Sequence, residues 1–255
     1  MAKIGVFDSG LGGLSVVRSI LDETKGHSIC YFGDTAHLPY GSKSVETIKR
    51  LSQQAFNFLI LQGVDVIIVA CNTVSSVALP YLNDIYKIPV IGVVESGVEA
   101  ALFTNKNRIG IIGTHNTIKS GRYEELLLNK KPDIKILKKP CPLFVPLVEE
   151  GIVDGPIADM IIAKYLLDFT GKIDTLILAC THYPALKKTI SKFLGNDIEL
   201  VDASMKIVSY IEKYLKKDEN KKKSEFYVTD RPENFSSLSK LFLDKSIKAE
   251  IVNIG

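Results

Sequence analysis

Residues 65–71 read DVIIVAC, and residues 174–180 read DTLILAC. Each stretch is a largely apolar run of strand length that begins with an aspartate and ends in a cysteine. Because the apolar residues do not alternate with polar ones, both faces of each strand must be covered, as in the centre of a parallel sheet. The two stretches therefore predict an α/β fold with parallel strands.

The strands upstream of these stretches also correspond. Residues 108–114 (RIGIIGT) match the pattern of residues 3–9 (KIGVFDS), and the separation in sequence is close to that between the two cysteines. Two matches in the same order indicate a duplicated half. We expect an α/β protein of two pseudo-symmetric lobes, residues 1–95 and 96–205. Each would be a mostly parallel sheet flanked by helices, with the active site in the cleft between them.

Shorter signals complete the outline. Helical spacing of apolar residues predicts helices at 14–23, after Ser44 and at about 74–86. β-rich runs predict strands at 28–32 and 89–94.

The C-terminal segment, residues 206–255, is predicted to hold a helix, a charged stretch at 216–223 and a strand at 225–229. The sequence pattern alone does not place this segment in the fold. Because Asp218 and Glu219 interrupt the charged stretch, we expect a solvated helix end and loop there, not a nucleic-acid site.

Composition excludes several classes of protein. Of 255 residues, 46% are hydrophobic and 24% are charged, with a net charge of +3, which is typical of a globular chain and not of a disordered one. The small net charge argues against nucleic acid as a partner. No apolar run is long enough to span a bilayer, and the N-terminus leads directly into a strand, so we expect a cytoplasmic protein without membrane contact.

Four cysteines occur, at positions 30, 71, 141 and 180, and none belongs to a CxxC pair. Their spacing predicts neither a metal site nor a disulfide framework. The glycine-rich turn at residues 10–13 lacks a nucleotide-binding fingerprint and follows the acidic Asp8. We therefore expect no cofactor and no metal, and we interpret Cys30 and Cys141 as structural.

Cys71 and Cys180 each follow a predicted buried strand and precede a helix. Ligands bind at the carboxyl ends of parallel strands, and the positive end of a helix dipole can lower a thiol pKa. A lone cysteine in such a place is more often a small buried hydrophobe, but two equivalent cysteines favour a chemical role. Two thiols on opposite sides of one cleft suit racemisation, in which one face of a carbon loses a proton and the other gains one.

Other polar residues are predicted to lie near the same edge. Asp8 and Ser9 follow the first strand, although either could instead cap the next helix. Tyr40 and Gly41 end a polar loop at 33–41, where a hydroxyl and backbone N–H groups could bind a carboxylate. His182 could tune the Cys180 thiol or simply begin a helix. The second half adds three polar candidates: Thr114, Thr117 and Glu149.

Five segments occur in a fixed order: FDSGLGGL (7–14), FGDTAHLPYG (32–41), ACNT (70–73), PLFVPLVEEG (142–151) and ACTHYP (179–184). In this combination the chain resembles the glutamate racemases over nearly its whole length. The resemblance implies a cofactor-independent enzyme that interconverts L- and D-glutamate for bacterial peptidoglycan synthesis. It also implies a two-lobed fold whose C-terminal segment returns to the first lobe.

The resemblance also implies roles for individual residues. Cys71 would accept the α-proton from D-glutamate and Cys180 from L-glutamate, with Asp8 and His182 assisting and Glu149 near the second thiol. Residues implied to contact substrate are Asp8, Ser9, Tyr40, Gly41, Asn72, Thr73, Thr181 and His182, and Thr114 is a further candidate. The expected partner is glutamate alone. The sequence does not determine the oligomeric state and leaves a homodimer open.

Two alternatives remain. The first is another racemase, decarboxylase or isomerase of the same superfamily, for instance one that acts on aspartate, because side-chain length is set by pocket shape. The second is a two-lobed binding protein that closes on a small anion without chemistry. Such a protein would not need a cysteine at both strand ends.

Overall fold

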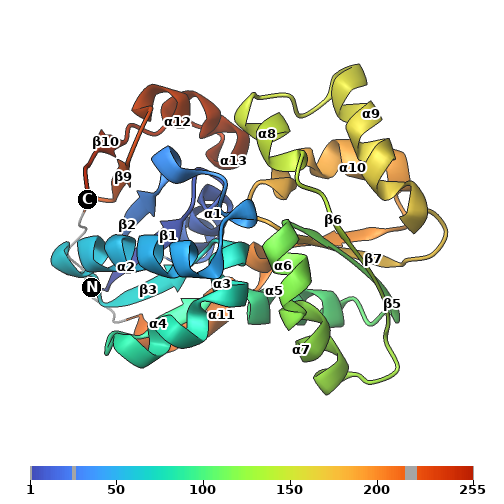
Figure 1. The fold of residues 1–255 in the computed structure, drawn as a ribbon, viewed down its shortest axis with the longest axis horizontal. Coiled ribbons are helices and arrows are strands. Elements are labelled where there is room, and N and C mark those ends of the chain that lie inside the picture. Colours follow the sequence, from blue (N-terminus) through green and yellow to red (C-terminus); the bar gives the residue numbers. More distant parts are fainter. Residues whose placement is uncertain (1, 25–26, 216–222, 255) are drawn as a thin grey trace.

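The computed structural model describes residues 2–24, 27–215 and 223–254. Its strands form two parallel sheets that lie side by side (Figure 1). We call the six-stranded sheet with its helices the first lobe and the four-stranded sheet with its helices the second lobe. Two sheets flanked by helices confirm the predicted α/β fold of two lobes.

The strand order is β10-β9-β2-β1-β3-β4 in the first sheet and β6-β5-β7-β8 in the second. The first-sheet strands are β1 (Lys3–Asp8), β2 (Ser28–Gly33), β3 (Val66–Val69), β4 (Val90–Gly92), β9 (Glu225–Val228) and β10 (Glu250–Ile251). The second-sheet strands are β5 (Arg108–Gly113), β6 (Lys135–Pro140), β7 (Thr175–Ala179) and β8 (Glu199–Val201). All paired strands run parallel.

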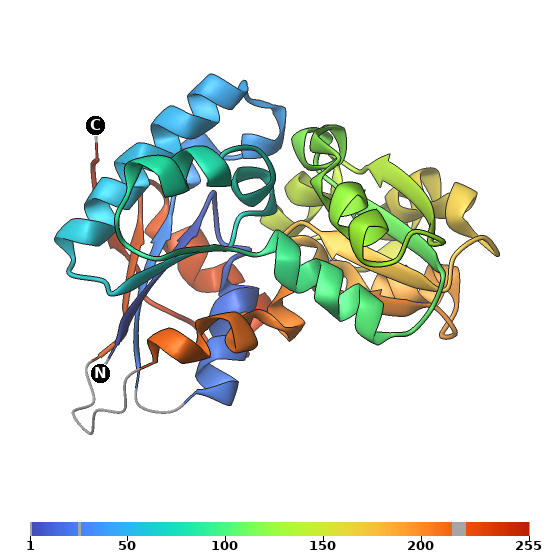
Figure 2. The ribbon, with the colours of Figure 1, turned by 90° about the horizontal axis from the view of Figure 1, so that it is seen from below.

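Helices cover both sheets (Figures 1 and 2). The first half of the chain supplies α1 (Leu14–Glu23), α2 (Val45–Leu61), α3 (Asn72–Val77), α4 (Leu79–Ile85) and α5 (Val94–Phe103). The second half supplies α6 (His115–Ser120), α7 (Arg122–Lys130), α8 (Phe144–Glu149), α9 (Gly155–Leu166) and α10 (Lys187–Leu194). The C-terminal segment adds α11 (Ile207–Ile211), α12 (Pro232–Leu238) and α13 (Lys240–Leu243).

β1, a central strand of the first sheet, is covered on both faces, as its apolar sequence predicts. Successive side chains of a strand point to opposite faces, so Val6 packs in the cluster that contains α1, while Phe7 packs in the cluster that contains α2. The start of α2 also agrees with prediction, because the Ser44 hydroxyl accepts a hydrogen bond from the Thr47 N–H and caps the helix.

The two apolar stretches that end in cysteine occupy equivalent places in the two lobes. β3 pairs with β1, where Ile68 lies opposite Val6, and β7 pairs with β5, where Ile177 lies opposite Ile111. The same neighbour relation in both sheets is what a duplicated half requires.

The helix expected at 74–86 is instead two short helices, α3 and α4, which meet at Ala78. Pro80 lies in the first turn of α4 and has no N–H to continue the hydrogen bonds of α3. The apolar periodicity continues across the break, which is why the sequence predicted one helix.

The C-terminal segment completes the first sheet. β9 pairs with β2 and β10 pairs with β9, and α11 packs against α1. Residues 216–222 of the charged stretch lie outside the described residues, and the proposed lobe boundaries at 95 and 205 stay a prediction. Across the described ranges, no helix combines the length and the apolar character needed to cross a membrane.

Candidate active site

The carboxyl ends of the central strands in both sheets face a small cavity between the lobes. It is lined by Ser9, Leu38, Pro39, Tyr40, Gly41, Cys71, Asn72, Thr73, Thr114, Val145, Cys180, Thr181 and His182. The cavity measures about 20 Å³, which is space for roughly one water molecule. This space is smaller than an amino acid.

Threonine hydroxyls join the lobes at one side of this cavity. The Oγ1 atoms of Thr73 and Thr114 lie 2.9 Å apart, and those of Thr114 and Thr117 lie 3.0 Å apart. Gly41 lies against Thr114 so closely that a Cβ at position 41 would be 2.4 Å from the Thr114 Cβ. The side chain of Asn116 donates to the backbone oxygen of Lys43 at 2.8 Å, which holds the loop that carries Gly41.

Cys71 is the residue immediately before α3, and its thiol donates to the Ser9 hydroxyl at 3.5 Å. Burial and the nearby negative charge of Asp8 raise the pKa of the Cys71 thiol to about 12, although the Ser9 contact lowers it. The expectation of a lowered pKa at this helix end is therefore wrong for Cys71. Desolvation outweighs the dipole of a helix of only six residues.

Cys180 has a different environment. Its sulfur lies 4.0 Å from Nδ1 of His182, and Nε2 of His182 lies 2.5 Å from Oε1 of Glu149. Burial alone lowers the pKa of His182, but the contacts with Cys180 and Glu149 outweigh it and hold that pKa well above its usual range. His182 thus links Cys180 to the carboxylate of Glu149.

Asp8 connects the lobes from beneath the cavity. It is fully buried and does not line the cavity, although the sequence places it at the same edge of the sheet. Oδ1 accepts from the Thr181 hydroxyl at 3.2 Å, and Oδ2 accepts from the Gly10 N–H at 3.1 Å. Burial raises the pKa of Asp8, an effect that nearby His182 opposes. Asp8 does not cap α1, because the residue before that helix is Gly13.

The hydroxyl of Tyr40 points to a buried carboxylate that sequence reasoning missed. It donates to Oδ2 of Asp34 at 2.5 Å, and Asp34 also accepts from the Thr229 hydroxyl at 2.8 Å. His37 contacts the same carboxylate through Nδ1 at 2.9 Å. Asp34 thus links the loop at 33–41 to the C-terminal segment. The Tyr40 hydroxyl already donates its proton to Asp34, so it has no proton left to donate to a ligand.

Two further residues escaped sequence analysis because no motif marks them. Asn116 lies in α6, and Tyr123 lies in α7, where its hydroxyl donates to Oδ1 of Asn72 at 2.6 Å. Both act across the lobes, and contacts between lobes leave no periodic signal in sequence.

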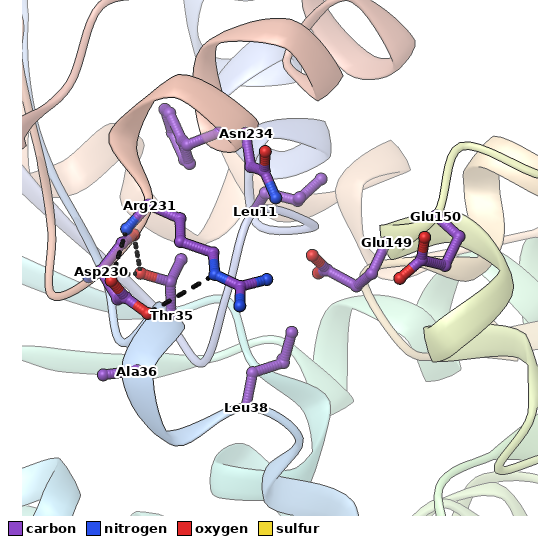
Figure 3. A pocket seen from close by; sticks show the side chains of 10 residues that line it. Leu11, Thr35, Ala36, Leu38, Glu149, Glu150, Asp230, Arg231 and Asn234 are labelled. Carbon is purple, nitrogen blue, oxygen red and sulfur yellow. Dashed lines mark hydrogen bonds and ion pairs between the residues drawn. The ribbon is translucent and has the colours of Figure 1, made fainter.

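A second and larger cavity, about 310 Å³, lies between α8 and α12 (Figure 3). Figure 3 shows Glu149 and Glu150 on one side and Arg231 and Asn234 on the other. No cysteine lines this cavity. Chemistry at a thiol therefore belongs to the small cavity, and the larger one gives the outer side of Glu149 access to water.

Comparison with known proteins agrees with this geometry. Residues 4–208 match the family model described as Asp/Glu/Hydantoin racemase. A glutamate racemase of Aquifex aeolicus is 46% identical over 252 residues, which cover 98% of both chains. One of Persephonella marina is 47% identical over 255 residues, covering 99% of this chain and 98% of the relative.

Solved structures give the same result. The glutamate racemase of Francisella tularensis, solved in complex with D-glutamate, is 42% identical and superposes with a TM-score of 0.90 over 99% of this chain and 98% of its own. Sequence and structure thus agree over almost the full length, and the chain belongs to the Asp/Glu/Hydantoin racemase family.

Proposed function

We propose that the protein interconverts L- and D-glutamate without a cofactor, by proton transfer between the α-carbon and two thiols, Cys71 and Cys180. The observation that carries this proposal is the pair of thiols on one cavity between the lobes, each at the end of an equivalent strand. The relatives named glutamate racemase, one of them bound to D-glutamate, support glutamate as the substrate.

The two thiols must differ in protonation at each turn of the reaction. In the L-to-D direction, the Cys180 thiolate accepts the α-proton from one face. The carbanion-like carbon then takes the proton of the Cys71 thiol from the other face. The raised pKa of Cys71 favours its protonated form, and the neighbour that distinguishes Cys180 from Cys71 is His182, whose Nδ1 lies 4.0 Å from the Cys180 sulfur. The D-to-L reaction uses the same residues in reverse.

The α-proton of an amino acid is far less acidic than a thiol, so the site must stabilise the carbanion-like state. Hydrogen-bond donors held in place around a carboxylate supply this stabilisation, and they act most strongly where water is excluded. Asn72 and Thr73 line the cavity and carry such donors. Closure of the lobes also fixes both sulfurs against the α-carbon.

The remaining roles follow from the resemblance. Asp8 and His182 assist the thiols, Glu149 supports His182, and Ser9 and the backbone at Gly41 contact substrate. The product would supply peptidoglycan synthesis in the cytoplasm.

Circular dichroism of L-glutamate with purified protein and no added cofactor tests the activity. We expect the signal to decay to zero as the racemate forms. A flat trace with glutamate and a changing trace with aspartate would show that the substrate is aspartate and not glutamate. Binding of glutamate without any change in signal would favour a two-lobed binding protein.

Variants test the mechanism. Cys71→Ala and Cys180→Ala should each abolish racemisation in both directions, because the acid of one direction is the base of the other. Cys30→Ala and Cys141→Ala are matched controls, since both thiols are buried away from the cavity and should leave turnover intact. A folded Cys71→Ala or Cys180→Ala protein with near-normal racemisation would exclude the two-thiol mechanism.

A further inference from the structure

Tyr123 of the second lobe reaches the residue that follows Cys71 in the first lobe. Its hydroxyl donates to Oδ1 of Asn72 at 2.6 Å. Both side chains are buried, with exposed fractions of 2% for Tyr123 and 3% for Asn72. Asn72 also lines the small cavity, so this hydrogen bond holds a group of the candidate active site from outside the cavity.

The fold makes room for this hydroxyl. A Cβ at Gly97 in α5 would lie 2.8 Å from the Tyr123 hydroxyl oxygen and 3.0 Å from its ring. Because Gly97 has no side chain, the tyrosine ring can pass it and reach Asn72. Burial raises the pKa of Tyr123, so the hydroxyl keeps its proton and remains a donor.

A carboxamide has two different ends. Its oxygen only accepts hydrogen bonds and its NH2 only donates them, so its orientation decides what it can bind. When the Tyr123 hydroxyl donates to the oxygen of Asn72, the NH2 group of Asn72 remains available to donate to a ligand. Either oxygen of a carboxylate can accept from that NH2, whereas a carboxamide ligand can accept only through its single oxygen and never through its own NH2.

We infer that Tyr123 is a positioning residue, which orients the Asn72 carboxamide as a donor and thereby selects a carboxylate over a carboxamide at this point of the substrate. The inference rests on the proposed function for the identity of the substrate. It concerns only the orientation of Asn72, and not the proton transfer at the thiols.

Tyr123→Phe tests the inference, because it removes the hydroxyl and keeps the ring. We expect the KM for glutamate to rise about tenfold, the loss that follows when an oriented donor to a charged group is no longer held. Glutamine and isoglutamine, the two monoamides of glutamate, serve as competitors. At least one of them should gain in affinity relative to glutamate, since a freed Asn72 can turn its oxygen to the ligand.

Tyr86→Phe is the matched control. The Tyr86 hydroxyl also donates to an asparagine side chain, Oδ1 of Asn57 at 2.8 Å, and neither residue lines the small cavity. This variant should leave both the KM and the ratio of affinities unchanged. Gly97→Ala is a second route to the same effect, because the new Cβ displaces the Tyr123 hydroxyl without removing it.

A double-mutant cycle separates positioning from packing. If Tyr123 acts through Asn72, then Tyr123→Phe adds nothing to the effect of Asn72→Ala on the KM. Additive effects, or an unchanged ratio of amide to glutamate affinity in both Tyr123→Phe and Gly97→Ala, would overturn the inference. Calorimetry measures the affinities in this ratio and does not require turnover. A wild-type protein that binds glutamate but does not racemise it would therefore refute the proposed function, separately from the inference about Tyr123.

Discussion

Gly12→Ala should push the lobes apart at the candidate active site. A Cβ at Gly12 would lie 2.6 Å from the carbonyl carbon of Thr181, 2.7 Å from its Oγ1 and 2.8 Å from the backbone nitrogen of His182. Carbon atoms in contact lie ~3.5–4.0 Å apart, so the second lobe must retreat by about 1 Å. Two of these three atoms belong to the backbone of Thr181 and His182, so a change of side-chain rotamer cannot relieve the contact. Gly12 does not have a left-handed φ, so alanine adds no conformational strain.

That displacement falls on the groups that the mechanism needs. Thr181 donates to Asp8, and His182 contacts Cys180. A misplacement of about 1 Å in a catalytic arrangement costs on the order of 100-fold in rate. We expect kcat/KM for glutamate to fall by about that factor, with a loss of about 1–3 kcal/mol in the free energy of unfolding from the crowding.

Gly171→Ala is the control for stability. Gly171 has a φ of +71°, and a Cβ there would meet nothing within 4 Å. Alanine in a left-handed conformation costs about 1–2 kcal/mol, so this variant should lose similar stability and keep its activity. Circular dichroism of glutamate and urea unfolding measure the two quantities. A Gly12→Ala protein with kcat/KM within about threefold of wild type would refute the claim that catalysis depends on the close approach of the lobes at Gly12.

Four further substitutions at three positions test two side-chain contacts and one backbone conformation. Glu149→Gln removes the carboxylate that raises the pKa of His182, a stabilising effect present below pH ~6.5 and lost as pH rises through the raised value. Its deficit in urea unfolding should therefore be largest at acidic pH and shrink on the alkaline side; a constant deficit would contradict this. Tyr40→Phe should cost about 1.5–3 kcal/mol of stability, because Asp34 loses a donor, while the KM for glutamate stays unchanged. A raised KM at unchanged stability would instead make the Tyr40 hydroxyl a substrate ligand. Arg231 has a φ of +47°, so Arg231→Gly should be more stable than Arg231→Ala by about 1 kcal/mol in thermal or urea unfolding, and the reverse order would exclude strain at this position.

Sequence patterns predict the central part of this fold because the signals there are local. Residues 65–71 and 174–180 must be buried on both faces, and the helix at 14–23 has an apolar stripe that ends where the structure ends it. The edge of the first sheet is different. β10 has two exposed residues and β9 is mostly half-buried, so neither strand carries a strong apolar pattern. Their place is set by the pairing of β9 with β2, which lies almost 200 residues away in the sequence, and the sequence pattern does not encode this pairing.

The distinction between local signals and contacts over a long sequence separation also applies to the candidate site. Residues that directly follow strands, such as Ser9, Cys71 and Thr181, could be predicted to line it because strand ends meet at one edge. Asp34 and Tyr123 could not, since each acts through a hydrogen bond whose partner is known only after the chain has folded. The raised pKa of Cys71 also escaped prediction, because burial in the closed cleft depends on both lobes at once.

In the proposed mechanism, duplication supplies the two thiols, and divergence between the copies gives them different surroundings. Two thiols in identical surroundings would have the same pKa. Racemisation instead needs one thiolate to remove the α-proton and one thiol to return a proton to the other face of the carbon. Burial and the nearby Asp8 raise the pKa of the Cys71 thiol, whereas Cys180 lies beside His182. The asymmetry thus originates in the residues after each strand, while the symmetric scaffold places both sulfurs on one cavity.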